Sequence, residues 1–183
     1  MSNVREAILR GTQAAARVHR DLELRQRLEE SGSRIDIFEI IATLELPLLF
    51  RPLDSLLGAF LRHPNPGILI TTKRQLSVQR FTGAHELGHY YLSHNPSLDS
   101  EDILRRSPFV SNADYEMQEM EADAFAVEFL LPRWLIRTQL KKHAWRAEEM
   151  NRPEMAYQLS LRVGASYDAT CRVLERYNII SQS

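Results

Sequence analysis

The sequence has almost no cysteine and no long apolar run. Cys171 is the only cysteine among 183 residues, which excludes an internal disulfide and any site built from several cysteines. No apolar stretch approaches the roughly 20 residues that span a bilayer. The first 30 residues are charged throughout and lack the apolar middle of a secretory signal. We therefore expect a cytoplasmic protein without a membrane partner.

An excess of charge of either sign is also missing. The formal net charge of −1 gives no reason to expect nucleic acid as a partner. The charges are nevertheless spread unevenly. Residues 82–130 contain ten Asp or Glu against two Arg, whereas residues 132–183 contain nine Lys or Arg against five acids. The acidic middle of the chain is suited to a site for a cation.

The spacing of apolar residues predicts an α+β fold that is mostly helical and has a small sheet. The expected helices span residues 2–29, 35–44, 77–94, 115–131, 134–143, 154–163 and 166–177. Strands are expected at 46–50 and 67–71, the segment 53–60 is ambiguous between helix and strand, and 95–114 is expected to be a polar surface loop. Ser166 is a suitable N-cap for the last helix.

The segment AHELGH at residues 84–89 carries the strongest chemical signal. His85 and His89 are four residues apart on a predicted helix, so their imidazoles project from one face and can bind one cation. Glu86 follows the first histidine and is placed to take a proton from a metal-bound water. Gly88 costs the helix about 1 kcal/mol relative to alanine, which predicts that another segment packs closely there. The pattern predicts a hydrolase that uses Zn2+.

The third metal ligand is not supplied by the same helix. A catalytic zinc usually has three protein ligands and leaves one position for water. His94 is nine residues after His85, so on a helix reaching His94 it would point to the opposite side. A ligand from another segment is therefore required.

The acidic helix predicted at 115–131 offers this ligand. Glu119 shares a face with Ala122, Asp123 and Ala126, and the two alanines allow a neighbouring helix to approach closely. We assign the third ligand to Glu119 and keep Glu121 as the alternative. Asp123, one turn after Glu119, is expected to accept a hydrogen bond from a ligating imidazole.

Two segments together resemble a known family. RFTGAHELGHYYLSH at residues 80–94, followed by EMEADAFAVEFLLP at residues 119–132, is similar to the ImmA/IrrE metallopeptidases of the gluzincin type, over roughly residues 35–135. Many relatives have Asn in place of Asp123, and many have a histidine where Ser93 stands, one position before His94. The resemblance implies a zincin-like fold and a regulatory protease that cleaves a helix-turn-helix repressor of the XRE/cI-like type.

Three parts of the chain are expected on this basis. Residues 1–34 form an N-terminal helix, residues 35–145 form the zinc metallopeptidase domain, and residues 146–183 form a short helical segment, similar to a helix-turn-helix, that packs on this domain. We interpret this last segment as a packing or substrate-docking element.

The chemistry expected at the site is metal-assisted hydrolysis. Zinc lowers the pKa of its water toward 7, Glu86 accepts the proton, and the hydroxide attacks a polarised carbonyl. The candidates for a donor to the resulting oxyanion are Arg80, Tyr115 and His143, and residue spacing does not separate them.

Two other functions are compatible with the sequence. The protein could bind a repressor without cutting it, as an antirepressor or a toxin–antitoxin component in which zinc serves structure or regulation. It could also be a DNA-binding regulator that uses the C-terminal helices, but Arg162, Arg172 and Arg176 are few basic residues for duplex binding. We therefore expect a protein substrate and no direct contact with nucleic acid. Hydrolysis is favoured because a structural zinc site has a fourth protein ligand and no need of Glu86.

Overall fold

The computed structural model describes residues 2–31, 34–62, 64–94, 97–100, 113–142 and 150–178. These residues confirm the α+β class, in which helices dominate and one small sheet is present. The helices are α1 (Ser2–Asp21), α2 (Leu24–Ser31), α3 (Ile37–Thr43), α4 (Leu76–Tyr91), α5 (Ala113–Leu130), α6 (Arg133–Lys142), α8 (Arg152–Val163) and α9 (Tyr167–Arg176). Within the described ranges, no helix is both long and apolar enough to cross a membrane.

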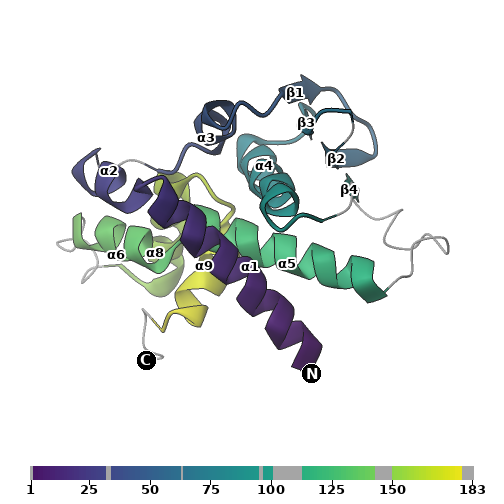
Figure 1. The fold of residues 1–183 in the computed structure, drawn as a ribbon. Helices are drawn as coiled ribbons and strands as arrows, with labels where there is room; N and C mark the ends of the chain where they lie inside the picture. Colours follow the sequence, from purple (N-terminus) through teal and green to yellow (C-terminus); the bar gives the residue numbers. More distant parts are fainter. Residues whose placement is uncertain are drawn as a thin grey trace.

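The sheet consists of β1 (Leu48–Arg51), β2 (Leu56–Leu61), β3 (Gly67–Thr71) and β4 (Ser97–Ser100), in the order β1-β3-β2-β4. β3 runs parallel to β1 and antiparallel to β2, and β4 pairs antiparallel with the other side of β2. α4 packs against β2 and β3 on one side and against α5 on the other, and α1 crosses α5 (Figure 1). α4 is therefore the central layer between the sheet and the remaining helices.

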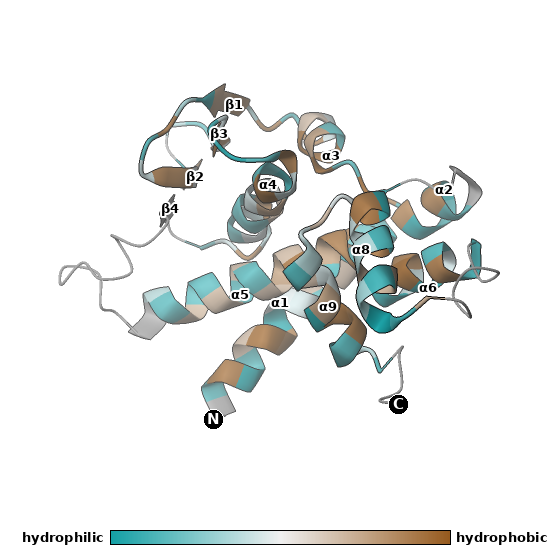
Figure 2. Cartoon of the chain, turned by 180° about the vertical axis from the view of Figure 1, so that it is seen from behind, coloured by the Kyte–Doolittle hydropathy of each residue, from teal (hydrophilic) through white to brown (hydrophobic). Residues whose placement is uncertain are grey.

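One hydrophobic core joins these layers. Apolar and polar stretches alternate along the helices (Figure 2), as expected for helices that bury one face. The core contains fully buried side chains from the sheet and from several helices, including Phe60, Leu87, Phe125, Phe129 and Ile136. Burial of these side chains holds α4 and α5 in place between the sheet and α1.

α1 crosses α5 at very short range. An ideal Cβ on Gly11 would lie 2.1 Å from the carbonyl oxygen of Glu121 and 2.9 Å from the backbone nitrogen of Phe125. Only glycine allows two helix backbones to come this close. The crossing places the middle of α1 directly beside the acidic segment of α5.

A buried arginine ties the C-terminal helices to the rest of the fold. Arg80 on α4 is 2% exposed and donates hydrogen bonds to the carbonyl oxygens of Ile35 (2.7 Å), Gly164 (3.0 Å) and Val163 (3.2 Å). Gly164 has a φ of 67° and ends α8 in the left-handed conformation that favours glycine. Arg80 thus has a structural role, which removes it from the oxyanion donor candidates.

The two C-terminal helices both begin with a side-chain cap. The Ser166 side chain accepts a hydrogen bond from the backbone nitrogen of Ala169, which confirms the predicted cap of α9. Asn151 caps α8 through a capping box with Glu154. Pro153 therefore lies in the first turn of α8, where proline is tolerated because no intrahelical N–H is needed.

Several predicted boundaries were wrong. The helix expected at 2–29 is two helices, which are separated at Leu22 and Glu23, and Glu23 has a φ of 51°. Neither residue is a typical helix breaker, so the sequence did not indicate the break. The ambiguous segment 53–60 contains strand β2, and Ser97–Ser100, expected in a loop, forms the edge strand β4. β4 is stabilised by pairing with β2, a contact that local sequence does not reveal. The rest of the loop, residues 101–112, lies outside the described residues.

His19 generates a prediction about pH. Its ring is buried, and its Nε2 lies 2.9 Å from the carbonyl oxygen of Phe129. Burial lowers the pKa of His19 from 6.5 to about 4, against the opposing effect of the hydrogen bond to Phe129. The unfolded chain therefore binds more protons than the folded protein between these two pH values. The contribution of neutral His19 to the free energy of unfolding is fully present above pH 6.5. It is lost as pH falls toward 4, by about 2 kcal/mol at pH 5.

The measurement is the free energy of unfolding of wild type and of His19→Gln at pH 7.5 and pH 5. Glutamine can still donate to Phe129 but does not titrate. The advantage of wild type over the variant should therefore shrink by about 2 kcal/mol at the lower pH. An advantage that is the same at both pH values would contradict the prediction.

Gly11 generates a prediction about packing. In Gly11→Ala the added methyl group meets the backbone of α5, so α1 must shift, and overpacking of this kind typically costs 1–3 kcal/mol. We expect a net loss of unfolding free energy even though alanine favours the helix by about 1 kcal/mol. The matched control is Gly83→Ala on α4, where the three atoms nearest to the methyl group all belong to side chains, those of Ile70 (3.2 Å), Phe38 (3.4 Å) and Ile37 (3.6 Å). Equal stability of the two variants in denaturant titrations would refute this account of the crossing.

Candidate metal centre

α4 and α5 bring two histidines and one carboxylate together. His85 Nε2 lies 3.2 Å from Glu119 Oε2, His89 Nε2 lies 3.4 Å from Glu119 Oε1, and the two Nε2 atoms are 3.0 Å apart. One ligand atom from each residue lies within 4.8 Å of the others, so the group could hold a metal ion. Both histidines are buried, and Glu119 is partly buried. The side chains predicted as ligands are thus adjacent.

This geometry depends on close contact between the two helices. An ideal Cβ on Gly88 would lie 3.1 Å from Phe125 Cβ and 3.2 Å from Ala122 Cα. Ala122 and Ala126 are completely buried. The prediction that another segment packs against Gly88, and that alanines on the second helix permit this, is confirmed.

Asp123 lies where the sequence predicted it. Its Oδ1 is 3.0 Å from His85 Nδ1, and a carboxylate in this position accepts the hydrogen bond. The bond fixes the proton of the neutral imidazole on Nδ1 and leaves the Nε2 lone pair for a metal. The Asp123 side chain is 49% exposed, so this anchor lies at the surface of the protein.

The alternative ligand, Glu121, is not part of the group. Its Oε2 lies 2.9 Å from His94 Nε2, and its Oε1 accepts a hydrogen bond from Arg10 Nη1 at 2.7 Å. Because Glu121 is two residues after Glu119 on a helix, its side chain points to a different side of α5. Its partner His94 is 4% exposed, and Glu121 itself is 3% exposed.

His94 is the residue that sequence reasoning placed wrongly. α4 ends at Tyr91 instead of continuing to His94, and Ser93 has a φ of 58°. This turn directs the His94 ring back toward α4, where its Nδ1 lies 3.0 Å from His89 Nδ1. Arg62 Nη1 lies 3.2 Å from the carbonyl oxygens of both Ser93 and His94 and donates to them. The sequence signal was only the presence of another histidine five residues after His89.

The donor atoms of the group match the needs of a divalent cation. Two imidazole nitrogens and a carboxylate face each other in a buried space, and Glu119 Oε1 has no hydrogen-bond partner among the described residues. Burial lowers the pKa of His85, but hydrogen bonds to Asp123 and Glu119 and the charge of Glu86 outweigh it and raise this pKa well above its ordinary value. Burial and the neighbouring His85 and His94 lower the pKa of His89 to about 2. The group thus attracts one positive charge and keeps His89 neutral, as a metal ligand must be.

Glu86 lies on the side of α4 that faces the sheet. It is fully buried, and its Oε1 lies 3.2 Å from the position that a Cβ on Gly58 would occupy. The same Cβ would lie 2.4 Å from Thr82 Cγ2. Glycine in β2 therefore leaves the space that the Glu86 carboxylate needs between α4 and the sheet.

The other two candidates for an oxyanion donor are Tyr115 and His143. Tyr115 lies on α5, one turn before Glu119, and its role stays a prediction. His143 lies outside the described residues.

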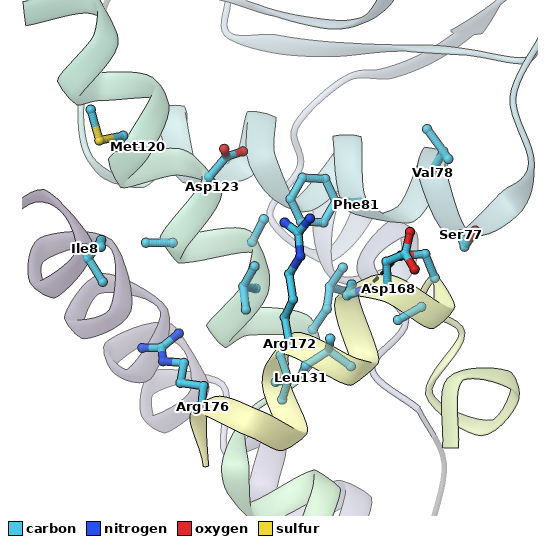
Figure 3. Close-up of a pocket in the computed structure, with 18 residues that line it drawn as sticks. Ile8, Ser77, Val78, Phe81, Met120, Asp123, Leu131, Asp168, Arg172 and Arg176 are labelled. Carbon is cyan, nitrogen blue, oxygen red and sulfur yellow. Dashed lines mark hydrogen bonds between the residues drawn. The ribbon is translucent and has the colours of Figure 1, made fainter. Parts of the chain in front are cut away.

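A cavity of about 640 Å³ adjoins the site from the side of Asp123. It lies between α1, α4, α5 and α9, and its lining includes Ile8, Phe81, Met120, Asp123 and Arg172. The Arg172 side chain extends from α9 toward Phe81, and Asp123 projects from α5 (Figure 3). The C-terminal segment thus forms one wall of a largely apolar cavity that reaches the anchor of His85.

The grouping of His85, His89 and Glu119 predicts one divalent metal ion per chain. Glu119→Gln removes the charge of the carboxylate, so we expect Zn2+ affinity to fall by at least about tenfold. Glu116→Gln is the matched control, because Glu116 is an exposed acid on the same helix and should bind zinc like wild type. The measurement is competition with a chromophoric chelator, followed by determination of metal content. Equal zinc affinity of the two variants would rule out Glu119 as a ligand.

Comparison with known families agrees with the geometry. A peptidase family model described as the IrrE N-terminal-like domain matches residues 43–175. No curated protein is significantly similar to the chain. The match contains α4, α5 and the metal-ligating group between them, and it extends over most of the chain. The chain therefore belongs to the peptidase family of IrrE N-terminal-like domains.

Proposed function

We propose that this protein is a zinc-dependent metalloendopeptidase that cleaves a helix-turn-helix transcriptional repressor of the XRE/cI-like type. The observation that carries the proposal is the grouping of His85, His89 and Glu119 within ligand distance of one another, with Glu86 on the same helix. Membership of a peptidase family supports a protein substrate. The helix-turn-helix repressor is the substrate implied by the resemblance to the ImmA/IrrE metallopeptidases.

In this proposal His85, His89 and Glu119 hold the zinc ion, and Glu86 is the general base. Bound zinc polarises a carbonyl oxygen and lowers the pKa of a coordinated water. Glu86 takes the proton of the attacking water and returns it to the leaving amine. Asp123 orients His85 through its Nδ1 proton. Because three protein ligands leave room for water and substrate, the arrangement fits a catalytic site better than a structural one.

The C-terminal helices fit a role in substrate docking better than a role in reading DNA. Arg176 Nη2 lies 3.4 Å from Thr12 Oγ1 and 3.9 Å from Glu128 Oε2. Arg172 lines the cavity beside Asp123. Arg176 is thus turned toward α1 and α5, and Arg172 toward the cavity, which leaves few basic groups for a phosphate backbone.

The test is incubation of the purified protein with helix-turn-helix repressors of the XRE/cI-like type from the same genome. Cleavage should require zinc and stop after chelation. Glu86→Gln should bind zinc like wild type but should cleave at least about a hundredfold more slowly, because it cannot accept a proton. Glu116→Gln, which changes an exposed acid outside the group, should cleave at the wild-type rate.

The outcomes separate the functional classes. Intact repressor in every sample, together with a stable complex formed by wild type and Glu86→Gln alike, would replace the peptidase proposal with a non-proteolytic binding partner. Salt-sensitive binding of duplex DNA that is lost when Arg172 and Arg176 are changed to Glu would instead indicate a DNA-binding regulator.

A further inference from the structure

A line of hydrogen bonds, buried except at its outer end, runs from the metal-ligating group to the N-terminal helix. His89 Nδ1 and His94 Nδ1 are 3.0 Å apart, His94 Nε2 and Glu121 Oε2 are 2.9 Å apart, and Arg10 Nη1 and Glu121 Oε1 are 2.7 Å apart. These contacts connect α4, the turn after it, α5 and α1. The only strongly exposed member is Arg10, whose side chain is 57% exposed, whereas the Glu121 side chain is 4% exposed.

We propose that His94, held by Glu121 and Arg10, is the positioning residue for His89, so that the N-terminal helix is part of the metal centre. The inference rests on the proposed function in that it requires a metal ion at His85, His89 and Glu119. It concerns how the protein sets the orientation and tautomer of its second histidine ligand.

The chemistry of these groups allows only one direction of donation along the line of hydrogen bonds. His89 binds a metal through the Nε2 lone pair, so its Nδ1 carries the proton and donates. His94 must then accept with Nδ1, which places the His94 proton on Nε2, where it is donated to the Glu121 carboxylate. Arg10 donates to the other oxygen of Glu121. Each donor therefore meets an acceptor, and this leaves only one arrangement of protons on the two rings.

The two histidine ligands are anchored in different ways. His85 donates directly to Asp123, a carboxylate that is half exposed. His89 donates to a neutral imidazole that is backed by a buried carboxylate. Neighbours of this kind usually contribute strongly to metal affinity, because they fix the ring and raise its basicity. The longer arrangement ties His89 to α1, through Arg10, as well as to α5.

Backbone features of the fold hold this line in place. The left-handed turn at Ser93 brings the His94 ring over His89, and Arg62 holds the carbonyl oxygen of His94. On α1, the close approach of Gly11 to the Glu121 backbone puts the neighbouring Arg10 within reach of the carboxylate. The family match begins at residue 43, so Arg10 acts on the site from outside the matched region.

The first experiment measures metal affinity of the full-length protein with Zn2+ in chelator competition and with Co2+ by its visible spectrum. His94→Leu removes both ring nitrogens and should weaken zinc binding about 10- to 100-fold and alter the Co2+ spectrum. His94→Asn keeps an acceptor beside His89 and should recover most of the affinity. Arg10→Gln should weaken binding about two- to fivefold, because the arginine is exposed.

The matched control is His19→Leu. His19 is also a buried histidine with one hydrogen bond to a residue of α5, but it lies away from the metal-ligating group. Its loss should lower stability without changing zinc affinity or the Co2+ spectrum. Thermal unfolding of each metal-free variant identifies any that do not fold. Because Arg10 is exposed, we expect Arg10→Gln to fold like wild type.

A second readout is the tautomer of each ring. In zinc-loaded protein with 15N-labelled histidine, His94 should carry its proton on Nε2 and His89 on Nδ1. A proton on His94 Nδ1 would overturn the proposal, because that nitrogen could not then accept from His89. Wild-type zinc affinity and an unchanged Co2+ spectrum in His94→Leu would overturn it as well, as would an equal loss of affinity in His19→Leu.

These outcomes can be told apart from failure of the proposed function. If wild type binds neither Zn2+ nor Co2+, the metallopeptidase proposal fails, and the positioning role fails with it. If wild type binds zinc, His89→Ala loses it and His94→Leu keeps it, only the positioning role is wrong.

Discussion

The close contact of α4 with α5 at Gly88 is the constraint on which the site depends. A Cβ atom at this position would lie within 3.2 Å of Phe125 and of the backbone of Ala122, so the helices would have to move apart by a few tenths of an ångström. Their separation decides whether Glu119 reaches the two Nε2 atoms. A glycine within a helix costs about 1 kcal/mol, and here it allows a helix contact that is closer than a Cβ atom normally permits.

The packing on the outer sides of these two helices serves the same centre. Gly58 in β2 leaves space for the buried Glu86 carboxylate, and Gly11 in α1 allows contact with the backbone at Glu121. Arg80 on α4 donates to the carbonyl oxygens of Val163 and Gly164 at the turn between α8 and α9, and also to that of Ile35 just before α3. The sheet and the C-terminal helices thus hold α4, and the N-terminal helix holds α5, so that the pair of helices around the histidines is fixed from several sides.

The neighbours of the two histidines also explain why the group can hold a cation. The Nδ1 atom of each ring faces outward to a hydrogen-bond partner, Asp123 for His85 and His94 for His89. Each Nε2 atom consequently faces inward toward Glu119. With the outer nitrogens engaged, the inner lone pairs and the carboxylate form a concentrated site for positive charge, which desolvation strengthens.

The proximity of side chains one helical turn apart could be predicted from the sequence, because helix periodicity alone decides which side chains share a face. This applies to His85 with His89 and to Glu119 with Asp123, and it also revealed that α5 could approach Gly88. The turn at Ser93, the edge strand β4 and the crossing of α1 over α5 had no local signal. The partners that join His94 to Glu121 and Glu121 to Arg10 are 27 and 111 residues apart. Such contacts form only when the chain packs, so the neighbours of His89 were decided by the tertiary structure.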